Sequence, residues 1–391
     1  MNRWAWVEVS ASAIEHNVRE LGALSAPAAV WAVVKANGYG HGAVTAARAA
    51  LAGGAQGLCV ALVQEGVELR AAGIDVPILV LSEQPGETAA AAIASKLAST
   101  VYSAQAVAAI AAAGGQQHPV HLKIDTGMRR VGADVDDAVA LADVIAASPA
   151  VSLAGVFTHL AVSEEVGNDF THVQLKRLDS ALAALAKAGH HPPVVHAANS
   201  AAAILYSSAR RDLTRIGIAI YGLSPSPELA DLCTSLRPAL SLHARVSFVK
   251  QVRAGEGISY GLRHVFGRDT TVATLPLGYA DGVSRRFAMA GGEVLLGGVR
   301  RRIVGVVTMD QLMVDCGPSS NGPLSNGPLS NGSASNGSAS NGSAVAVGDH
   351  VVLIGRQGDE EISVDEWAQR LGMINYEIVC GLTQRLERRS T

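Results

Sequence analysis

A lysine at the end of an apolar run is the residue in this sequence best suited to chemistry. The β-forming segment 30–34 leads directly into Lys35, and three glycines follow before an alanine-rich stretch. This order is typical of a strand, a turn and a helix, with the lysine at the carboxyl end of the strand, where parallel α/β folds build their sites. A lysine buried beside apolar residues is shifted toward its neutral, nucleophilic form, which forms imines with aldehydes.

The same segment also fits a second, weaker pattern. Gly38, Gly40 and Ala43 match the dinucleotide-binding fingerprint G-x-G-x-x-G/A, and Glu65 follows the next apolar run, 57–62, as the acidic residue of that fold would. A lysine at a strand end is also more often solvated than nucleophilic. The segment alone therefore leaves the cofactor open, and the rest of the chain must decide.

The composition narrows the class of protein. The chain has 391 residues, of which 49% are hydrophobic and 17% charged, and its formal net charge is -3. This length favours two domains, and so small a charge argues against binding nucleic acid or an anionic membrane. The four cysteines lie far apart without a C-x-x-C pair, so neither a disulfide framework nor a zinc site is predicted. No apolar segment resembles a membrane span or a signal peptide, and we expect a cytoplasmic protein.

Eight short apolar segments alternate with alanine-rich amphipathic segments between residues 29 and 222. The predicted strands are 30–35, 57–62, 77–82, 97–102, 119–124, 153–159, 194–198 and 215–221, and helical patterns between them include 63–72, 104–113, 135–147 and 169–188. Eight β/α repeats without a large gap predict a closed (β/α)8 barrel of the TIM type, in preference to an open doubly wound sheet.

The pattern changes after Pro238. Short β-rich segments separated by glycines follow, which predicts a C-terminal, mostly β domain over residues 239–391 after a barrel over residues 1–238. About the first ten residues are expected to pack with the β domain. Residues 320–344 repeat the letters Ser-Asn-Gly-Pro-Leu and then Ser-Asn-Gly-Ser-Ala. We expect this insertion to be a flexible surface excursion and assign it no function.

Polar residues recur at the ends of the predicted strands, where a barrel gathers its catalytic groups. Barrels commonly bind phosphate in the loops after strands seven and eight, where Ser200 and the amides of Gly217 and Ile218 would lie. An imine-forming lysine beside a phosphate cradle indicates pyridoxal 5′-phosphate (PLP), which carries both an aldehyde and a phosphate. The residues at these strand ends are Lys35, Tyr39, Lys123, His159, Asn199, Ser200, Arg215, Gly217 and Ile218.

Over nearly its whole length outside the Ser-Asn-Gly tract, the chain resembles the alanine racemase family of fold-type III PLP enzymes. The motif at 33–42 is similar to that family's PLP-attachment signature, and this likeness overturns the dinucleotide interpretation. The other matching motifs are Lys-Ile-Asp-Thr-Gly-Met at 123–128, Arg-Ile-Gly-Ile-Ala-Ile-Tyr-Gly at 215–222, Ile-Ser-Tyr-Gly at 258–261, Leu-Pro-Leu-Gly-Tyr-Ala-Asp-Gly at 275–282 and Met-Asp-Gln at 309–311.

The resemblance implies an enzyme that interconverts L-alanine and D-alanine with two bases and supplies D-alanine for peptidoglycan. Lys35 would bind PLP covalently and act on the D-enantiomer, and Tyr260 would act on the L-enantiomer from the other subunit of a homodimer. A phenol with a pKa of about 10 is a poor base at neutral pH and needs positive charge nearby. The family resemblance suggests a hydrogen-bonded chain through His159 and Arg215.

Arg215 distinguishes the implied reaction from other PLP chemistry. The resemblance places its guanidinium against the pyridine nitrogen, and because a guanidinium only donates, that nitrogen must accept and stay unprotonated. The ring then withdraws fewer electrons, which favours return of the proton to Cα over transamination.

The resemblance also implies roles for the remaining residues. Lys123 matches a position that is N-carboxylated in several relatives and would support Arg130, which spacing favours over Arg129. No metal site is expected, because His159 has no second ligand at a suitable spacing. The implied cofactor-binding set is Lys35, Tyr39, His159, Asn199, Ser200, Arg215, Gly217, Ile218 and Tyr376, and the implied substrate-binding set is Arg130, Met309 and Tyr279.

Two positions depart from the family pattern and leave the substrate range open. Thr308 stands where Cys or Ser is frequent, and Val306 stands where an entrance arginine is frequent. A serine racemase or a racemase of broader specificity is one alternative. A fold-type III decarboxylase and a non-catalytic PLP-binding protein are others, against which Arg215 and Tyr260 argue.

Overall fold

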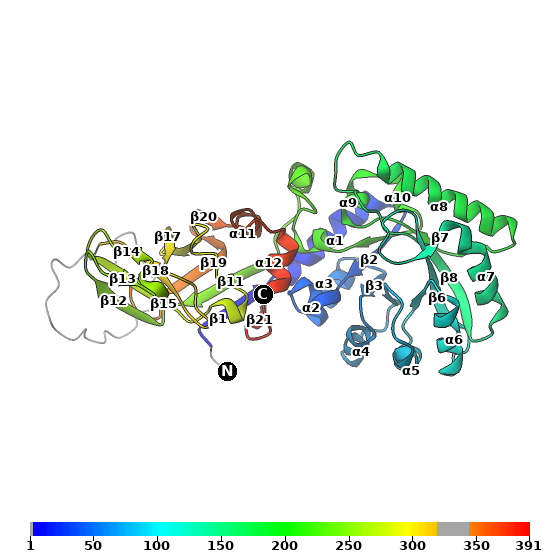
Figure 1. The fold of residues 1–391 in the computed structure, drawn as a ribbon, viewed down its shortest axis with the longest axis horizontal. Coiled ribbons are helices and arrows are strands. Elements are labelled where there is room, and N and C mark those ends of the chain that lie inside the picture. The colour runs from blue at the N-terminus through cyan, green and yellow to red at the C-terminus, as the bar shows by residue number, and fades with distance from the viewer. Residues whose placement is uncertain (1–2, 319–343) are drawn as a thin grey trace. The chain divides into compact units, whose positions relative to one another are not determined.

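The computed structural model describes residues 3–318 and 344–391 and divides into two compact units (Figure 1). The barrel unit is formed by Ala11–Ala239, and the β unit combines the N-terminal residues up to Ser10 with Leu240–Thr391. The Ser-Asn-Gly tract, up to residue 343, lies outside the described residues. Within the described ranges, no helix is long and apolar enough to cross a membrane.

Eight parallel strands form the barrel. They pair in the orders β10-β2-β3-β4 and β5-β6-β8-β9. A bridge between Leu79 and Ala98 joins β4 to the segment before β5, and the Arg215 amide of β10 donates to the Ala198 carbonyl after β9 at 3.0 Å. The ring is thereby closed, which confirms the predicted fold class. The strands are β2 (Ala29–Val33), β3 (Gly57–Val60), β4 (Ile78–Val80), β5 (Ser99–Val101), β6 (His118–Asp125), β8 (Val151–Phe157), β9 (Val195–His196) and β10 (Leu213–Ile216), and β7 (Ala133–Asp134) pairs with β6.

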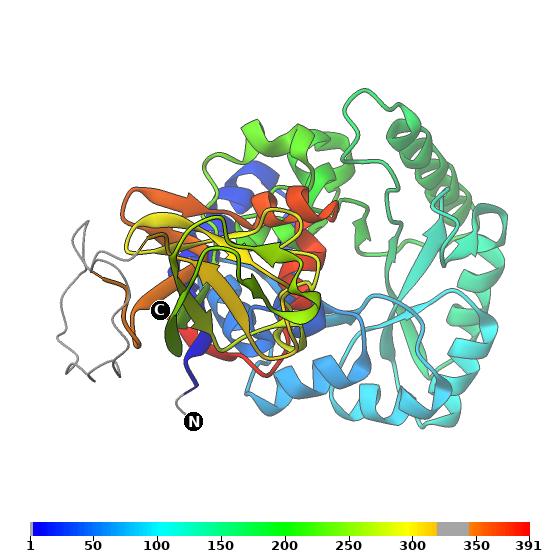
Figure 2. The same cartoon turned by 60° about the vertical axis from the view of Figure 1, so that its left-hand side comes forward.

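Alanine-rich helices lie outside these strands (Figure 2). In α8, buried residues recur three or four positions apart, as a helix with one face on the barrel requires. The helices of this unit are α1 (Ala11–Ser25), α2 (Lys35–Tyr39), α3 (Ala43–Ala52), α4 (Val63–Ala71), α5 (Ala89–Ala94), α6 (Ala104–Ala112), α7 (Ala138–Ala147), α8 (Phe170–Lys187), α9 (Ser200–Leu205) and α10 (Ser207–Arg210), with 3-10 turns at Gly86–Thr88, Val135–Asp137, Ile218–Tyr221 (η3) and Pro227–Cys233.

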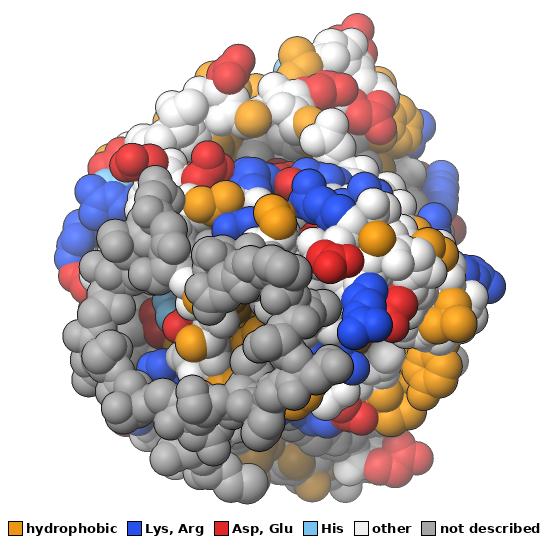
Figure 3. Space-filling model, turned by 90° about the vertical axis from the view of Figure 1, so that its left-hand side faces the viewer, with side chains coloured by type: hydrophobic (Ala, Val, Ile, Leu, Met, Phe, Trp, Pro, Cys, Tyr) orange, Lys and Arg blue, Asp and Glu red, His pale blue; other side chains and the backbone are white. Residues whose placement is uncertain are grey.

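The β unit is built on one long sheet of order β12-β15-β18-β17-β16-β19-β11-β1-β21, with β20 pairing β19 and a separate β13-β14 hairpin. Where Figure 3 leaves this face uncovered, basic and acidic side chains lie close to one another. The strands are β1 (Ala5–Val9), β11 (Leu240–Arg245), β12 (Phe248–Val252), β13 (Gly257–Ile258), β14 (His264–Val265), β15 (Thr270–Leu275), β16 (Glu293–Leu296), β17 (Val299–Val304), β18 (Leu312–Asp315), β19 (His350–Gln357), β20 (Glu360–Ile362) and β21 (Glu387–Ser390), and the helical elements are α11 (Val364–Leu371), α12 (Asn375–Gly381), η5 (Tyr260–Leu262) and η6 (Tyr279–Asp281).

Candidate functional site

The turn that carries Lys35 is wound in the left-handed sense. Strand β2 ends at Val33, two residues earlier than predicted, and Lys35 opens the α2 segment. The backbone angle φ is 52° at Ala36, 53° at Asn37 and 61° at Gly38. A non-glycine residue in this region costs about 1–2 kcal/mol, so neighbouring contacts must hold the turn. Lys35 itself is half-buried, not buried as the sequence predicted.

Two side chains hold the backbone of this turn. One oxygen of the Glu65 carboxylate, in the first turn of α4, accepts the Ala36 amide at 2.6 Å. The other oxygen accepts two amides at the start of Glu65's own helix, at 2.8 and 3.1 Å. The Asn37 side-chain carbonyl accepts the Ala43 amide at 2.9 Å and caps α3. Glu65 thus joins the loop after β2 to the loop after β3. The dinucleotide pattern had suggested a different role for it, as the acidic residue that binds the ribose.

A polar cradle lies where β9 and β10 end. The Asn199 side-chain oxygen accepts an amide of α9 at 2.9 Å and so fixes the start of that helix at Ser200. Ser200 Oγ accepts the Gly217 amide at 2.9 Å. A Cβ on Gly217 would lie 2.5 Å from the Tyr39 hydroxyl, so only glycine leaves room there. The fold thus brings together the loops that carry the predicted phosphate-binding residues Tyr39, Ser200, Gly217 and Ile218.

Arg215 on β10 is the buried cation of the site, with 3% of its surface exposed. Its guanidinium donates to His196 Nδ1 at 2.7 Å and approaches His159 Nδ1 at 3.5 Å. It also donates to the carbonyls of Thr158 and Ala197 at 2.8 and 3.0 Å. Among the described residues, no acceptor meets its Nε–H. Burial lowers the pKa of Arg215 to about 10, which still leaves the group charged at neutral pH.

Two neutral histidines continue from Arg215 into the barrel. Because a guanidinium only donates, His196 Nδ1 is an acceptor and the ring proton lies on Nε2. That Nε2 then donates to His121 Nδ1 at 2.9 Å. Burial, together with the charge of Arg215, lowers the pKa of His121 to about 4 and that of His196 well below its usual range. These hydrogen bonds, from Arg215 to His196 and from His196 to His121, can form only while both imidazole rings are neutral.

We therefore expect the barrel to lose stability in mild acid. An unfolded histidine binds a proton near pH 6.5, whereas folded His121 does so only near pH 4, so the unfolded state binds more protons between these values. The stability is present above pH 6.5, and about 3 kcal/mol is lost as the pH falls to about 4. Urea unfolding across this range measures the loss. His121→Gln keeps an acceptor for His196 without titrating, so its pH dependence should be shallower; an unchanged slope would contradict the assignment.

Lys123 lies buried on β6, with 5% of its surface exposed. Its Nζ donates to the Leu81 carbonyl at 3.3 Å, and no ion pair joins it to a carboxylate in the part of the chain that the structure describes. A buried ammonium without a counter-ion is costly, so the neutral amine is favoured. Burial lowers the pKa of Lys123 to about 8, and three nearby cations add to the effect: Arg215, Arg130 and Lys35.

In the loop after β6, Arg129 and Arg130 have different surroundings. These are the two arginines that the sequence offered for the substrate carboxylate. Asp125 accepts the Arg129 amide at 3.1 Å, and the Arg129 side chain pairs with Asp134 at 3.1 Å. The charge of Arg130, in contrast, lowers the pKa of Lys123. The Arg129 side chain is thus paired within its own loop, whereas Arg130 adds to the positive charge around Lys123.

The barrel residues fit PLP. The crowded cradle at Gly217 suits a phosphate, the spare N–H of Arg215 suits an unprotonated ring nitrogen, and Lys35 supplies the amine. His159 follows β8 and is half-buried. Burial and the charge of Arg215 lower its pKa well below the usual range, so it offers a neutral ring.

Tyr260 lies in the β unit, on the short η5 turn, and is 72% exposed. The residue before it, Ser259, has a φ of 64° and donates from its hydroxyl to the Val306 carbonyl at 3.0 Å. A Cβ on Gly305 would lie 2.6 Å from the Cβ of Ser259, so this turn depends on the glycine. A groove of about 520 Å³ adjoins it, lined in part by Phe248, Ile258, Tyr260 and Met313.

The other predicted residues of the β unit fall in two places. Tyr279 and Met309 belong to adjacent loops, because the Tyr279 amide donates to the Thr308 carbonyl at 2.9 Å. The η6 turn that carries Tyr279 is fixed by Asp281, which is fully buried and pairs with Arg3 at 2.6 Å. Tyr376 is half-buried as the second residue of α12.

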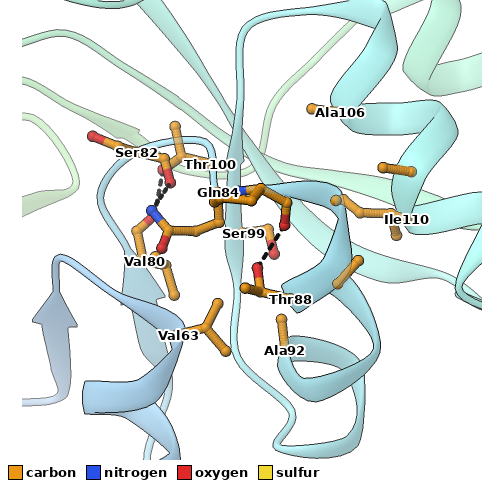
Figure 4. Close-up of a pocket in the computed structure, with 14 residues that line it drawn as sticks. Val63, Val80, Ser82, Gln84, Thr88, Ala92, Ser99, Thr100, Ala106 and Ile110 are labelled. Carbon is orange, nitrogen blue, oxygen red and sulfur yellow. Dashed lines mark hydrogen bonds between the residues drawn. The ribbon is translucent and has the colours of Figure 1, made fainter.

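A separate small cavity lies between β4, β5 and the helices α5 and α6 (Figure 4). Its volume of about 30 Å³ has room for water but not for an amino acid or a cofactor. Within the described ranges, no group of three or more metal-binding side chains is close enough to hold a metal ion.

Sequence reasoning missed three contributors to the site. Glu65 carried a usable signal, since a glutamate three residues after a helix start is typical of a capping interaction. His196 lies in the predicted strand 194–198, but no local pattern linked it to His121, which is 75 residues away in the chain. A Cβ on Gly155 would lie 2.6 Å from the His121 ring, so that glycine makes room for it.

Comparisons with known proteins agree with this architecture. Residues 9–225 match the family "Alanine racemase, N-terminal domain", and residues 239–390 match "Alanine racemase, C-terminal domain". The alanine racemase of Symbiobacterium thermophilum is 43% identical over 389 residues, which cover 99% of this chain and 97% of that protein. The alanine racemase of Frankia casuarinae is 42% identical, over 97% of this chain and 94% of the other.

Solved structures show the same likeness. The alanine racemase of Bacillus anthracis with bound L-Ala-P superposes with a TM-score of 0.89 at 37% identity, covering 100% of this chain and 96% of the other. That of E. faecalis superposes with a TM-score of 0.87 at 35% identity, covering 100% and 98%. The chain therefore belongs to the alanine racemase family.

Proposed function

We propose that this chain is a PLP-dependent alanine racemase that interconverts L-alanine and D-alanine and supplies D-alanine for peptidoglycan in the cytoplasm. The observation that carries the proposal is the buried Arg215, which stays charged and keeps one N–H available beside the Lys35 turn and the Gly217 cradle. The Bacillus anthracis relative was solved with L-Ala-P, and the same class of small amino acid fits this proposal.

The barrel domain, residues 1–238, would hold the cofactor. Tyr39, Ser200 and the Gly217 and Ile218 amides would bind its phosphate, and Asn199 fixes the helix that starts at Ser200. Bound PLP draws electrons away from the Cα–H bond of the attached amino acid. Arg215 would donate to the ring nitrogen without protonating it, which would favour return of the proton to Cα over another carbon. His159 would pack beside the ring, and Tyr376 would add a contact to the phosphate.

Two bases on opposite faces account for inversion at Cα. The Lys35 amine removes or returns the proton of the D-enantiomer, and the Tyr260 hydroxyl does so for the L-enantiomer. Tyr260 would come from the C-terminal domain, residues 239–391, of a partner subunit. Its high exposure supports this arrangement, because a 72% exposed tyrosine beside an apolar groove is a surface suited to a second copy of the chain.

A homodimer is therefore part of the proposal. The side chains around Tyr260 that favour association are exposed and apolar. Sedimentation of the purified protein tests whether it forms a dimer. We expect a dimer. If the protein is diluted until it is monomeric and still racemises alanine at the same rate per chain as the dimer, the shared site is contradicted. The exposed apolar residues of this surface are Phe248, Tyr260, Leu262 and Val265.

The substrate carboxylate would be bound by Arg130 and the Met309 amide, with Tyr279 narrowing the entrance. Lys123 is suited to support Arg130 as a carbamate, because its neutral amine is well populated near its pKa of about 8. In that reaction the amine nitrogen bonds to the carbon of CO2 and releases one proton. The product carries one negative charge, where the neutral amine carried none, and lies among three cations.

We expect this carbamate to be detectable. Protein equilibrated with isotopically labelled bicarbonate should show one carbamate carbon signal by NMR, and Lys123→Met should lack it. Lys187→Met, at an exposed lysine of α8, is the control and should keep the signal. A signal that survives in Lys123→Met would contradict the assignment.

Chiral analysis of L-alanine and L-serine incubated separately in deuterated water with PLP-loaded protein tests the proposed function. D-alanine deuterated at Cα is the expected product, and the rate with serine, relative to alanine, defines specificity. Alanine recovered unchanged and undeuterated, with PLP still bound, would exclude the proposal.

A further inference from the structure

One carboxylate outside the predicted site, that of Glu65, accepts a hydrogen bond from the residue next to the proposed catalytic lysine. The Glu65 oxygen that accepts the Ala36 amide at 2.6 Å contacts the residue that directly follows Lys35. Its second oxygen accepts two amides at the start of α4. All three donors are backbone groups, so Glu65 joins the loops that follow β2 and β3.

We propose that Glu65 is a positioning residue: it holds the left-handed turn that presents Lys35 to the site. This inference rests on the proposed function of Lys35. Glu65 is the only acceptor for the Ala36 amide among the described residues. The remaining bonds of the turn, such as Gly38 N to the Val34 carbonyl at 2.9 Å, do not involve that amide.

The left-handed conformation of Ala36 gives this contact its importance. An alanine with a φ of 52° is unfavourable, and the right-handed alternative would rotate the peptide that joins it to Lys35. The direction of the lysine side chain would change with that peptide. A charge-assisted bond to the Ala36 amide favours the observed conformation over this alternative. The free-energy cost of the left-handed conformation at Ala36 is therefore offset by the hydrogen bond to Glu65, which lies in the neighbouring loop.

The chain contains a matched control. Glu83 follows β4, and its two oxygens accept the Tyr102 amide and the Ser103 hydroxyl, which follow β5. It thus joins two neighbouring barrel loops as Glu65 does. The residues on either side of it in the chain, Ser82 and Gln84, line the small cavity in Figure 4. None of the proposed site residues belongs to these two loops.

The experiment compares Glu65→Gln with Glu83→Gln. Glutamine keeps one acceptor but replaces the other with an NH2 group, which cannot accept an amide. The rate at which added PLP attaches to Lys35 of the apoprotein is followed by absorbance and verified by borohydride trapping and peptide mapping. We expect Glu65→Gln to be slower by about tenfold to a hundredfold, the effect of one charge-assisted hydrogen bond. Glu83→Gln should stay within about twofold of the unaltered protein.

A second substitution separates positioning of Lys35 from capping of α4. Glycine adopts a left-handed φ freely, so Ala36→Gly should restore most of the attachment rate in the Glu65→Gln background. A capping defect in α4 would not respond to this change. If Glu65→Gln does not fold, Glu65→Asp is used in the same comparison, since the shorter side chain cannot reach both loops.

The outcomes are distinct. Equal rates in Glu65→Gln and the unaltered protein, equal slowing in both glutamine variants, or no rescue by Ala36→Gly would each overturn the positioning role. If the unaltered protein does not attach PLP at Lys35 at all, the proposed function fails instead.

Discussion

Lys35→Ala is expected to abolish covalent attachment of PLP and to lower racemisation by about four orders of magnitude, the upper range for a positioned acid–base group. Lys35 would be both the point of attachment and the base for D-alanine, and alanine supplies neither function. The variant should fold, because Lys35 is half-buried at the start of a turn held by Glu65 and Asn37.

The measurement is the absorbance of the bound cofactor before and after borohydride, followed by peptide mapping. Lys187→Ala changes an exposed lysine on α8 and should keep the full signal. A borohydride-stable adduct retained by Lys35→Ala would place the attachment elsewhere and remove the basis of the two-base proposal.

Tyr260→Phe is expected to remove exchange at one face of the substrate only. The variant keeps the ring and loses the hydroxyl, so it cannot take the proton from L-alanine. Net racemisation should fall by about 10²–10⁴-fold in both directions, since the two enantiomers have equal free energy. The distinguishing result is in deuterated water. D-alanine should still exchange its Cα proton without inversion through Lys35, whereas L-alanine should not.

Tyr206→Phe is a suitable comparison, because Tyr206 lies in the barrel unit between α9 and α10 and outside the proposed site. It should leave exchange from both enantiomers near the normal rate. If Tyr260→Phe slowed exchange from D-alanine and L-alanine equally, Tyr260 would not be the base for one face.

Much of the architecture could be predicted because local pattern and burial agree. Apolar segments of about five residues alternate with alanine-rich helices, and eight such repeats without a large gap favour closure into a barrel over an open sheet. The positions of β2 and β3 therefore agree with prediction to within two residues. The strand predicted at 215–221 was partly wrong, because β10 ends at Ile216 and Ile218–Tyr221 forms a 3-10 turn. The resemblance to the alanine racemases is confirmed by the family comparisons.

The conformation of the Lys35 turn was beyond this reasoning. Its glycines predicted a turn, but they also fitted a dinucleotide site, and nothing local required Ala36 to be left-handed. That conformation is unfavourable by itself and is held by Glu65, which is 29 residues away along the chain. A local sequence pattern indicates only which conformations are favourable locally. It therefore cannot predict a strained conformation, such as that of Ala36, that is stabilised by a contact from another loop.

The sequence by itself predicted the barrel, the β-rich second part, Lys35 as the candidate PLP lysine and the family, since each of these depends on residue types and short spacings. Only the tertiary structure decided which groups surround Arg215. His196 contacts Arg215 from β9, and His121 contacts His196 from β6. The tautomer of His196 follows from a donor that cannot accept. The same holds for Lys123, whose pKa is lowered by burial and by cations from three other segments. Such effects arise from distances through space, and sequence separation does not encode them.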